Sequence, residues 1–171
     1  MQKAWFLDRD GTIIEDKHYL SNPDDVELLN GTIEALRAAQ SDGFLLIVVT
    51  NQSGIARGFF SESDADKVDK RLSDVLIGYG IKITASYRCP HLPEGISPYN
   101  INCKCRKPGT ALFEQAIRDY NLDVSQCIAC GDKLRDIERL PSIGIPKENT
   151  GIIDGKSFDN LLSFYTSVRR K

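Results

Sequence analysis

What this sequence lacks already narrows its class. In 171 residues, no apolar run approaches the roughly 20 residues that a membrane-spanning helix needs. The first six residues lead directly into charged ones and not into the long apolar stretch of a signal peptide. Neither sign of charge is in excess, with 22 Lys and Arg against 24 Asp and Glu, which argues against steering towards nucleic acid or anionic lipid. We expect one cytoplasmic domain, residues 1–171, without internal repeats or low-complexity segments.

Short apolar runs alternate with segments of helical periodicity along the whole chain. The runs expected to form strands lie at residues 4–7, 44–49, 127–130 and 151–153, with a more polar candidate at 81–87. The segments expected to form helices lie at residues 32–41, 61–77, 110–120 and 158–168. Ser61, with Asp64 three residues later, is a typical N-cap of the second helix. The alternation predicts an α/β fold with a doubly wound, mostly parallel, Rossmann-like sheet. Its ligand crevice is expected at the carboxyl ends of the strands.

Polar side chains follow three of the expected strands. The first strand leads to Asp8 and Asp10, the second to Thr50 and Ser53, and the strand that ends near residue 130 to Asp132. Two carboxylates about 4 Å apart repel by about 4 kcal/mol at an effective dielectric constant of about 20, so such a cluster needs a cation or a raised pKa. Oxygen ligands with room left for water and phosphate suit Mg²⁺. The sequence therefore predicts a magnesium site whose hydroxyl groups can bind phosphate oxygens.

Residues 88–109 break the alternation because they combine four prolines with four potential metal ligands. Such a proline-rich segment reads as a loop and not as a helix or an interior strand. The ligands form a Cys-x-His pair and a Cys-x-Cys pair separated by 11 residues, namely Cys89 with His91 and Cys103 with Cys105. Three thiolates and one imidazole complete a tetrahedral zinc shell without a position for water, which predicts a structural Zn²⁺ site. An iron–sulfur cluster or a disulfide between Cys103 and Cys105 is the alternative.

The charged motifs, taken in order, resemble those of the haloacid dehalogenase-like (HAD-like) phosphohydrolases over about residues 4–138. They are the segment DRDGT at 8–12, Thr50, Lys107, and the segment GDKLRD at 131–136. The resemblance implies that Asp8 is a nucleophile and that Asp10 is a general acid and base. It also implies that Thr50 and Lys107 stabilise the transferring phosphoryl group. Mg²⁺ would be held by Asp8, the backbone carbonyl of Asp10, and Asp132. The intervals between motifs are too short for a large cap domain.

The sequences of two expected loops narrow this resemblance to one family. The segment TNQSGIARG at 50–58 and the zinc loop followed by Arg-Lys-Pro are similar to the D,D-heptose 1,7-bisphosphate phosphatases, and the histidinol phosphatases share most of the pattern. The resemblance implies Mg²⁺-dependent removal of one phosphate from a small phosphorylated sugar, in nucleotide-activated heptose synthesis. Substrate contacts carried over from the family are Asp16, Tyr19, Asn51, Gln52, Ser53, Arg106 and Lys133. No nucleic acid or membrane partner is expected, and the protein is expected to be a monomer.

Several residues keep two interpretations at this point. Asp136 either ligates Mg²⁺ through water or lies in the first turn of a helix, where the dipole favours a carboxylate. Arg57 either contacts the substrate or is a solvated loop residue. The Cys-x-x-Cys spacing of Cys127 and Cys130 matches a redox motif, but we interpret them as buried apolar residues because they lie in an expected strand. After Asp136 the sequence departs from the family, because residues 140–146 contain two prolines where the family continues a helix.

Two other functions compete with heptose bisphosphate hydrolysis. One is hydrolysis of histidinol phosphate or another small phosphometabolite by the same chemistry. The other belongs to a different class, a zinc-stabilised binding module with a vestigial active site. The net charge of −2 and the lack of interleaved aromatic and basic residues argue against such a module for nucleic acid.

Overall fold

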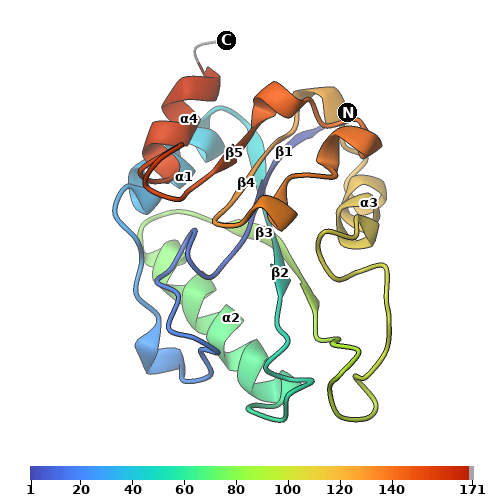
Figure 1. Cartoon of the computed structure of the whole chain (residues 1–171). Helices are drawn as coiled ribbons and strands as arrows, with labels where there is room; N and C mark the ends of the chain where they lie inside the picture. The colour runs from blue at the N-terminus through green and yellow to red at the C-terminus, as the bar shows by residue number, and fades with distance from the viewer. Residues whose placement is uncertain (170–171) are drawn as a thin grey trace.

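A twisted sheet of parallel strands forms the centre of the molecule (Figure 1). The computed structural model describes residues 1–169, so the last two residues of the expected domain lie outside the described residues. The strands are β1 (Lys3–Leu7), β2 (Phe44–Asn51), β3 (Ile83–Cys89), β4 (Ile128–Gly131) and β5 (Thr150–Ile152). They pair in the order β3-β2-β1-β4-β5, and every pair is parallel. The predicted α/β fold with a doubly wound parallel sheet is confirmed.

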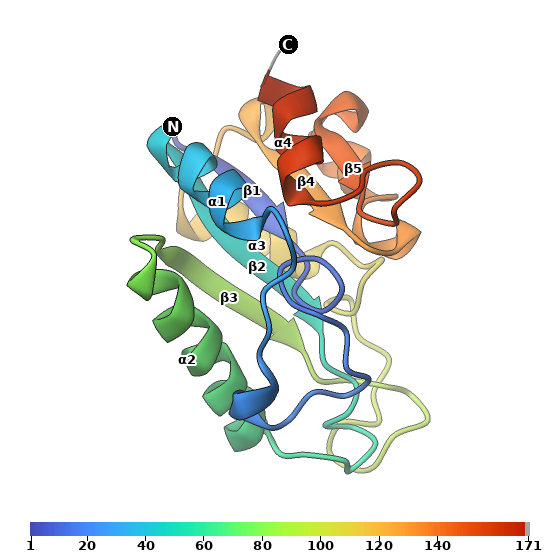
Figure 2. The same ribbon diagram turned by 90° about the vertical axis from the view of Figure 1, so that its left-hand side faces the viewer.

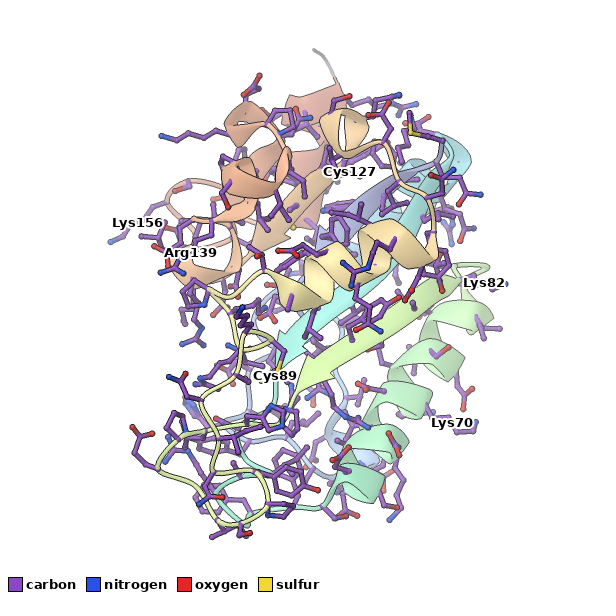
Figure 3. All side chains as sticks on the ribbon, turned by 90° about the vertical axis from the view of Figure 1, so that its right-hand side faces the viewer. Lys70, Lys82, Cys89, Cys127, Arg139 and Lys156 are labelled. Carbon is purple, nitrogen blue, oxygen red and sulfur yellow. The ribbon has the colours of Figure 1, made fainter. Side chains whose placement is uncertain are left out.

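Helices cover both faces of this sheet. On one face lie α1 (Thr32–Ser41), α2 (Glu62–Gly78) and α4 (Leu161–Arg169), as Figure 2 shows, and α3 (Ala111–Asp119) crosses the other face (Figure 3). Successive residues of β1 alternate between the two layers, because Trp5 and Leu7 pack against α1, α2 and α4 whereas Ala4 and Phe6 pack against α3. All four side chains are buried. The apolar run at the start of the sequence therefore reflects a strand that is covered on both sides.

The ends of several elements follow local sequence signals. Ser61 caps α2 as predicted, since its hydroxyl accepts a hydrogen bond from the Asp64 amide and the Asp64 carboxylate accepts one from the Ser61 amide. The strand β3 begins and ends two residues later than the predicted 81–87, so the expectation that Arg88 and Cys89 belong to the loop was wrong. Both still pair with β2 at the edge of the sheet, and the first proline comes after them.

The chain after residue 138 also keeps the sheet complete. The segment with two prolines forms 3-10 turns, at Leu140–Ile143 and Lys147–Asn149. Three residues of β5 then pair with β4 and close the edge of the sheet. A short strand suffices here because an edge strand needs a partner on one side only.

Three long loops gather at the carboxyl ends of β1, β2 and β3, at the bottom of Figure 1. Between each of these strands and the next helix, the described residues contain no helix beyond one 3-10 turn, Pro23–Asp25. A large cap domain is therefore absent from the described part of the chain, as predicted. No helix within residues 1–169 is long and apolar enough to cross a membrane.

Candidate active site

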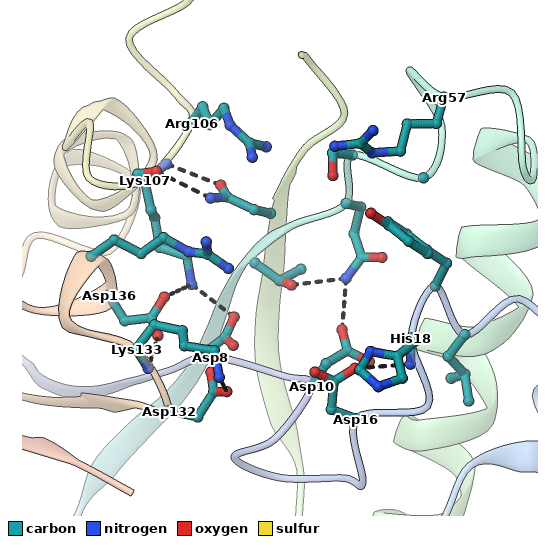
Figure 4. Close-up of a pocket in the computed structure, with 18 residues that line it drawn as sticks. Asp8, Asp10, Asp16, His18, Arg57, Arg106, Lys107, Asp132, Lys133 and Asp136 are labelled. Carbon is teal, nitrogen blue, oxygen red and sulfur yellow. Dashed lines mark hydrogen bonds and ion pairs between the residues drawn. The ribbon is translucent and has the colours of Figure 1, made fainter. Parts of the chain in front are cut away.

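The loops at the carboxyl ends of the strands surround an open pocket of about 310 Å³ (Figure 4). This volume matches a small metabolite. The residues predicted to be catalytic, to bind substrate or to ligate magnesium all line it: Asp8, Asp10, Asp16, Tyr19, Thr50, Asn51, Gln52, Ser53, Arg106, Lys107, Asp132 and Lys133. Four further polar residues line the same pocket, namely His18, Arg57, Arg135 and Asp136. Residues from four separate parts of the sequence thus meet where the topology of the sheet places a ligand.

Lys107 is the electrostatic centre of the pocket floor. Its ammonium nitrogen lies 2.7 Å from Asp8 Oδ1, 2.7 Å from Asp136 Oδ1 and 2.7 Å from the carbonyl oxygen of Val49. The side chain is almost completely buried. Burial lowers the pKa of Lys107, but the two carboxylates outweigh this effect and raise its pKa above the ordinary value. The residue therefore carries a fixed positive charge beside the predicted nucleophile.

Three carboxyl groups form a possible cation site next to this lysine. Oxygen atoms of Asp8, Asp132 and Asp136 all lie within 4.8 Å of one another. Hard oxygen donors at this spacing fit Mg²⁺, with positions left for water or phosphate. The side chain of Asp10, in contrast, points to other partners, so a role in holding Mg²⁺ falls to its backbone carbonyl, and that role stays a prediction.

Asp136 lies in a short helical turn and also beside the possible cation site, and its ligation of Mg²⁺ through water stays a prediction. It is the last residue of a 3-10 turn, Leu134–Asp136, and its Oδ2 accepts a hydrogen bond from the Lys133 amide at 2.9 Å. Its other oxygen faces Lys107. Burial and the charge of Asp8 raise the pKa of Asp136, although Lys107 opposes them. Asp136 is thus a structural partner of the lysine that also lies in the possible cation site.

Asp10 lies beside this centre and has its own set of donors. Its Oδ2 accepts a hydrogen bond from Gln52 Nε2 at 2.8 Å, and the same nitrogen donates to Thr50 Oγ1 at 2.9 Å. The guanidinium group of Arg9 is 3.0 Å from the same oxygen. Burial raises the pKa of Asp10, and the charge of Asp8 adds to this effect against the opposing charge of Arg9. A carboxyl group with a raised pKa suits a residue that must give up a proton and later accept one.

Asn51 has a more specific geometry than the sequence suggested. Its Oδ1 accepts a hydrogen bond from the backbone amide of Lys107 at 2.9 Å, and its Nδ2 donates to the backbone carbonyl of Lys107 at 3.2 Å. The two ends of the Asn51 amide therefore fix the backbone that carries the lysine. The predicted contact of Asn51 with substrate stays a prediction.

An aromatic wall borders the pocket on the side of the first loop. Tyr19 packs edge to face against Phe59, with 4.9 Å between ring centroids, and the Arg57 guanidinium lies 5.7 Å from the Tyr19 ring. Tyr19 and His18 both have positive φ angles, of 65° and 51°, a conformation uncommon for residues other than glycine. Arg57 is exposed and lines the pocket, and its contact with a substrate stays a prediction.

Sequence reasoning gave no role to Arg9 or Asp69. Arg9 is 1% exposed and pairs with Asp69 of α2 at 2.8 Å, as well as with Asp10. One signal could have found Asp69, because it lies four residues after Ala65 and three before Leu72, in the buried stripe of α2. A carboxylate within such a stripe needs a cationic partner.

The Cys–His cluster, which comprises Cys89, His91, Cys103 and Cys105, lies where β3 runs into the following loop (Figure 3). The Sγ atoms of its three cysteines are 3.1 to 3.5 Å apart, and the imidazole Nδ1 is 3.2 Å from Cys105 Sγ and 3.7 Å from Cys89 Sγ. Thiolates bound at about 2.3 Å to a tetrahedral Zn²⁺ are about 3.8 Å apart, so the donors fit this ion after a small expansion.

Two further observations bear on the alternatives for this cluster. All cysteines are free, so the alternative of a disulfide between Cys103 and Cys105 is not present. Burial raises the pKa of Cys103, but hydrogen bonds from Cys105 and from backbone amides outweigh it and lower the pKa to about 6. A thiolate at neutral pH is the form that binds a metal ion.

The second cysteine pair belongs to the core. Cys127 and Cys130 are both buried, and the indole nitrogen of Trp5 donates to Cys130 Sγ at 3.3 Å. Burial raises the pKa of Cys127 to about 11 and also raises that of Cys130. Their interpretation as apolar core residues is confirmed, because a buried, protonated thiol is a poor nucleophile.

Comparison with known proteins assigns this arrangement to a class. The model of the family described as polynucleotide kinase 3 phosphatase matches residues 3–150. The crystal structure of a HAD-like phosphatase candidate from Mesorhizobium loti is similar with a TM-score of 0.84 and 28% identity, covering 99% of this chain and 87% of that one. D,D-heptose 1,7-bisphosphate phosphatase from B. bronchiseptica, crystallised with magnesium and phosphate, has the same fold, with a TM-score of 0.78, 24% identity and 99% of each chain covered. Fold and motifs are those of a HAD-like phosphatase.

The curated relatives narrow the class further. The D-glycero-beta-D-manno-heptose-1,7-bisphosphate 7-phosphatase of Haemophilus ducreyi is 43% identical over 84% of this chain and 80% of its own length. The chain therefore belongs to the polynucleotide kinase 3 phosphatase family, alongside the D-glycero-D-manno-heptose-1,7-bisphosphate 7-phosphatases. The predicted family is confirmed, and the chain is a phosphatase.

Proposed function

We propose that this phosphatase removes the C7 phosphate from D-glycero-D-manno-heptose 1,7-bisphosphate, with Mg²⁺ at the pocket floor and Zn²⁺ in the Cys–His cluster. The observation that best supports this proposal is the position of Lys107, 2.7 Å from both Asp8 and Asp136, at the base of a pocket of about 310 Å³. The name of the Haemophilus ducreyi relative supports the substrate and the phosphate that leaves. Five cysteines without a disulfide support action in the reducing cytoplasm, in nucleotide-activated heptose synthesis.

The residues of the pocket floor account for a two-step reaction. A carboxylate oxygen of Asp8 attacks phosphorus, the bond from phosphorus to the sugar oxygen breaks, and Asp10 gives its proton to that oxygen. Asp10 then accepts a proton from the water that hydrolyses the aspartyl-phosphate, which releases inorganic phosphate and restores Asp8. Lys107 and Thr50 stabilise the charge of the transferring group. Bound Mg²⁺, held by Asp8 and Asp132 with the Asp10 carbonyl, would reduce repulsion between the nucleophile and the phosphate.

The rim of the pocket favours a bisphosphate over histidinol phosphate. Four cationic side chains line it, namely Arg57, Arg106, Lys133 and Arg135. They can meet a second phosphate through charge-assisted hydrogen bonds. The ammonium group of histidinol would meet the same positive charges without a phosphate to neutralise them. Asp16, Tyr19, Gln52 and Ser53 also line the pocket, which supports contacts between these polar side chains and sugar hydroxyl groups.

The test is phosphate release with Mg²⁺ from both anomers of heptose 1,7-bisphosphate, fructose 1,6-bisphosphate and histidinol phosphate. We expect kcat/KM for one heptose anomer to exceed that of the other compounds by at least about 100-fold. Asp8→Asn is the matched control and is expected to abolish turnover. Equal, slow hydrolysis of every compound would refute the heptose assignment, and preference for histidinol phosphate would favour the second candidate from the sequence.

A further inference from the structure

A line of ion pairs runs from the pocket to the surface between α2 and β3. The Arg9 guanidinium is 1% exposed and lies between two carboxylates, 3.0 Å from Asp10 Oδ2 and 2.8 Å from Asp69 Oδ1. Asp69 Oδ2 accepts a hydrogen bond from Arg88 Nη1 at 3.1 Å, and Arg88 also pairs with the exposed Asp66. Negative and positive charges alternate over five residues, so each buried charge has a partner of opposite sign.

Arg9 approaches Asp10 in a way that sets the plane of its carboxyl group. Its Nε donates to Asp10 Oδ2 at 3.1 Å, and its Nη2 lies 3.0 Å from the same oxygen. Because the guanidinium is a rigid planar fork, its orientation determines where these donors point. The remaining nitrogen, Nη1, donates to Asp69. Asp69 therefore fixes the orientation of the guanidinium.

The two oxygens of Asp10 consequently differ. Gln52 and Arg9 Nε both donate to Oδ2, at 2.8 Å and 3.1 Å, whereas Oδ1 accepts one longer hydrogen bond, of 3.4 Å, from Arg9 Nη2. An oxygen that already accepts two hydrogen bonds, one of them from a cation, is a poor site for a proton. The proton that Asp10 gives to a leaving group thus belongs on Oδ1.

We propose that Asp69, acting through Arg9, is a positioning residue that directs Oδ1 of Asp10 towards the leaving oxygen of the substrate. This inference rests on the proposed function, in which Asp10 is the general acid. Neither Arg9 nor Asp69 lines the pocket, so their effect on the reaction passes through Asp10. Loss of a residue that only positions the general acid slows a reaction strongly when the leaving oxygen needs a proton and weakly when it does not.

Leaving-group dependence provides the test. A sugar alkoxide needs the proton of Asp10, whereas p-nitrophenolate leaves without it. We expect Asp69→Ala to lower kcat/KM for heptose 1,7-bisphosphate by about 10- to 100-fold and for p-nitrophenyl phosphate by at most about 3-fold. The control is Asp66→Ala, which removes the exposed end of the same line of ion pairs and is expected to keep both values within about 2-fold. Asp69→Asn, which keeps an acceptor for Arg9, is expected to restore most of the lost activity.

Equal losses on the two substrates would overturn the proposal, because they would mean that Asp69 only supports the fold. No loss on either substrate would overturn it as well. If the wild-type protein hydrolyses a different alkyl phosphate, the heptose assignment fails, and the comparison is made with that compound instead. Crystal structures of the wild-type protein and Asp69→Ala give a readout independent of turnover. We expect the carboxyl group of Asp10 to rotate by more than about 20° in the variant, and an unchanged Asp10 would refute the positioning role.

Discussion

Replacing Asn51 by alanine tests whether this side chain holds Lys107 in place. The change removes two hydrogen bonds to the backbone of Lys107, of 2.9 Å and 3.2 Å. A typical internal hydrogen bond contributes about 1 kcal/mol, so the free energy of unfolding should fall by about 2 kcal/mol. For a chain of 171 residues, 1 kcal/mol corresponds to roughly 2–4 °C in Tm, so Asn51→Ala should melt about 4–8 °C below the wild-type protein.

The same change should lower kcat while leaving KM nearly unchanged. Lys107 Nζ lies 2.7 Å from Asp8, and a backbone that is free to shift misplaces this charge, so we expect kcat to fall about 10-fold with KM within about 3-fold of the wild-type value. Calorimetry in saturating Zn²⁺ and steady-state phosphate release measure the two effects. Ser53→Ala is the matched control for stability, because Ser53 lines the same pocket and its side chain forms no hydrogen bond with another described residue. An unchanged Tm with a raised KM would refute this reasoning and show that Asn51 contacts the substrate.

Three further changes probe the site and its support. After a chelator removes metal, we expect a thiol reagent at pH 8 to modify Cys103 and Cys105, which are partly exposed, but not the buried Cys89, Cys127 and Cys130. Burial raises the pKa of these three thiols, that of Cys127 to about 11, so more than two reactive thiols in the folded protein would contradict their burial. Lys107→Met leaves two buried carboxylates without their cation. The free energy of unfolding in urea should therefore fall by about 3 kcal/mol, and kcat should drop at least about 100-fold. Unchanged stability would mean that these ion pairs contribute little. Gly131→Ala places a methyl group against the carboxyl group of Asp136, so phosphate release should slow by about 10-fold as Asp136 moves away from Lys107; wild-type kcat would contradict this close packing.

The order of strands and helices was predictable because its signals are local. Buried strands of a parallel sheet appear as short apolar runs, and a helix with one buried face repeats its apolar residues every three to four positions. The motifs at the ends of β1, β2 and β4 were predictable for a related reason, since parallel strands bring their carboxyl ends to one edge. The four members of the Cys–His cluster were also predictable as a group from their spacing and residue types.

Other features depend on contacts between distant parts of the chain. Arg9 and Asp69 are 60 residues apart, and Asn51 and Lys107 are 56 residues apart. These pairs form because α2 packs beside β3 and because the loop after β3 returns to the end of β2. Residue types and spacing alone determined the fold class, the predicted chemistry and the possible metal ligands. Only the tertiary structure decided which donors face Asp10 and what holds Lys107, because those contacts depend on how helices and loops pack after the side chains between them are buried.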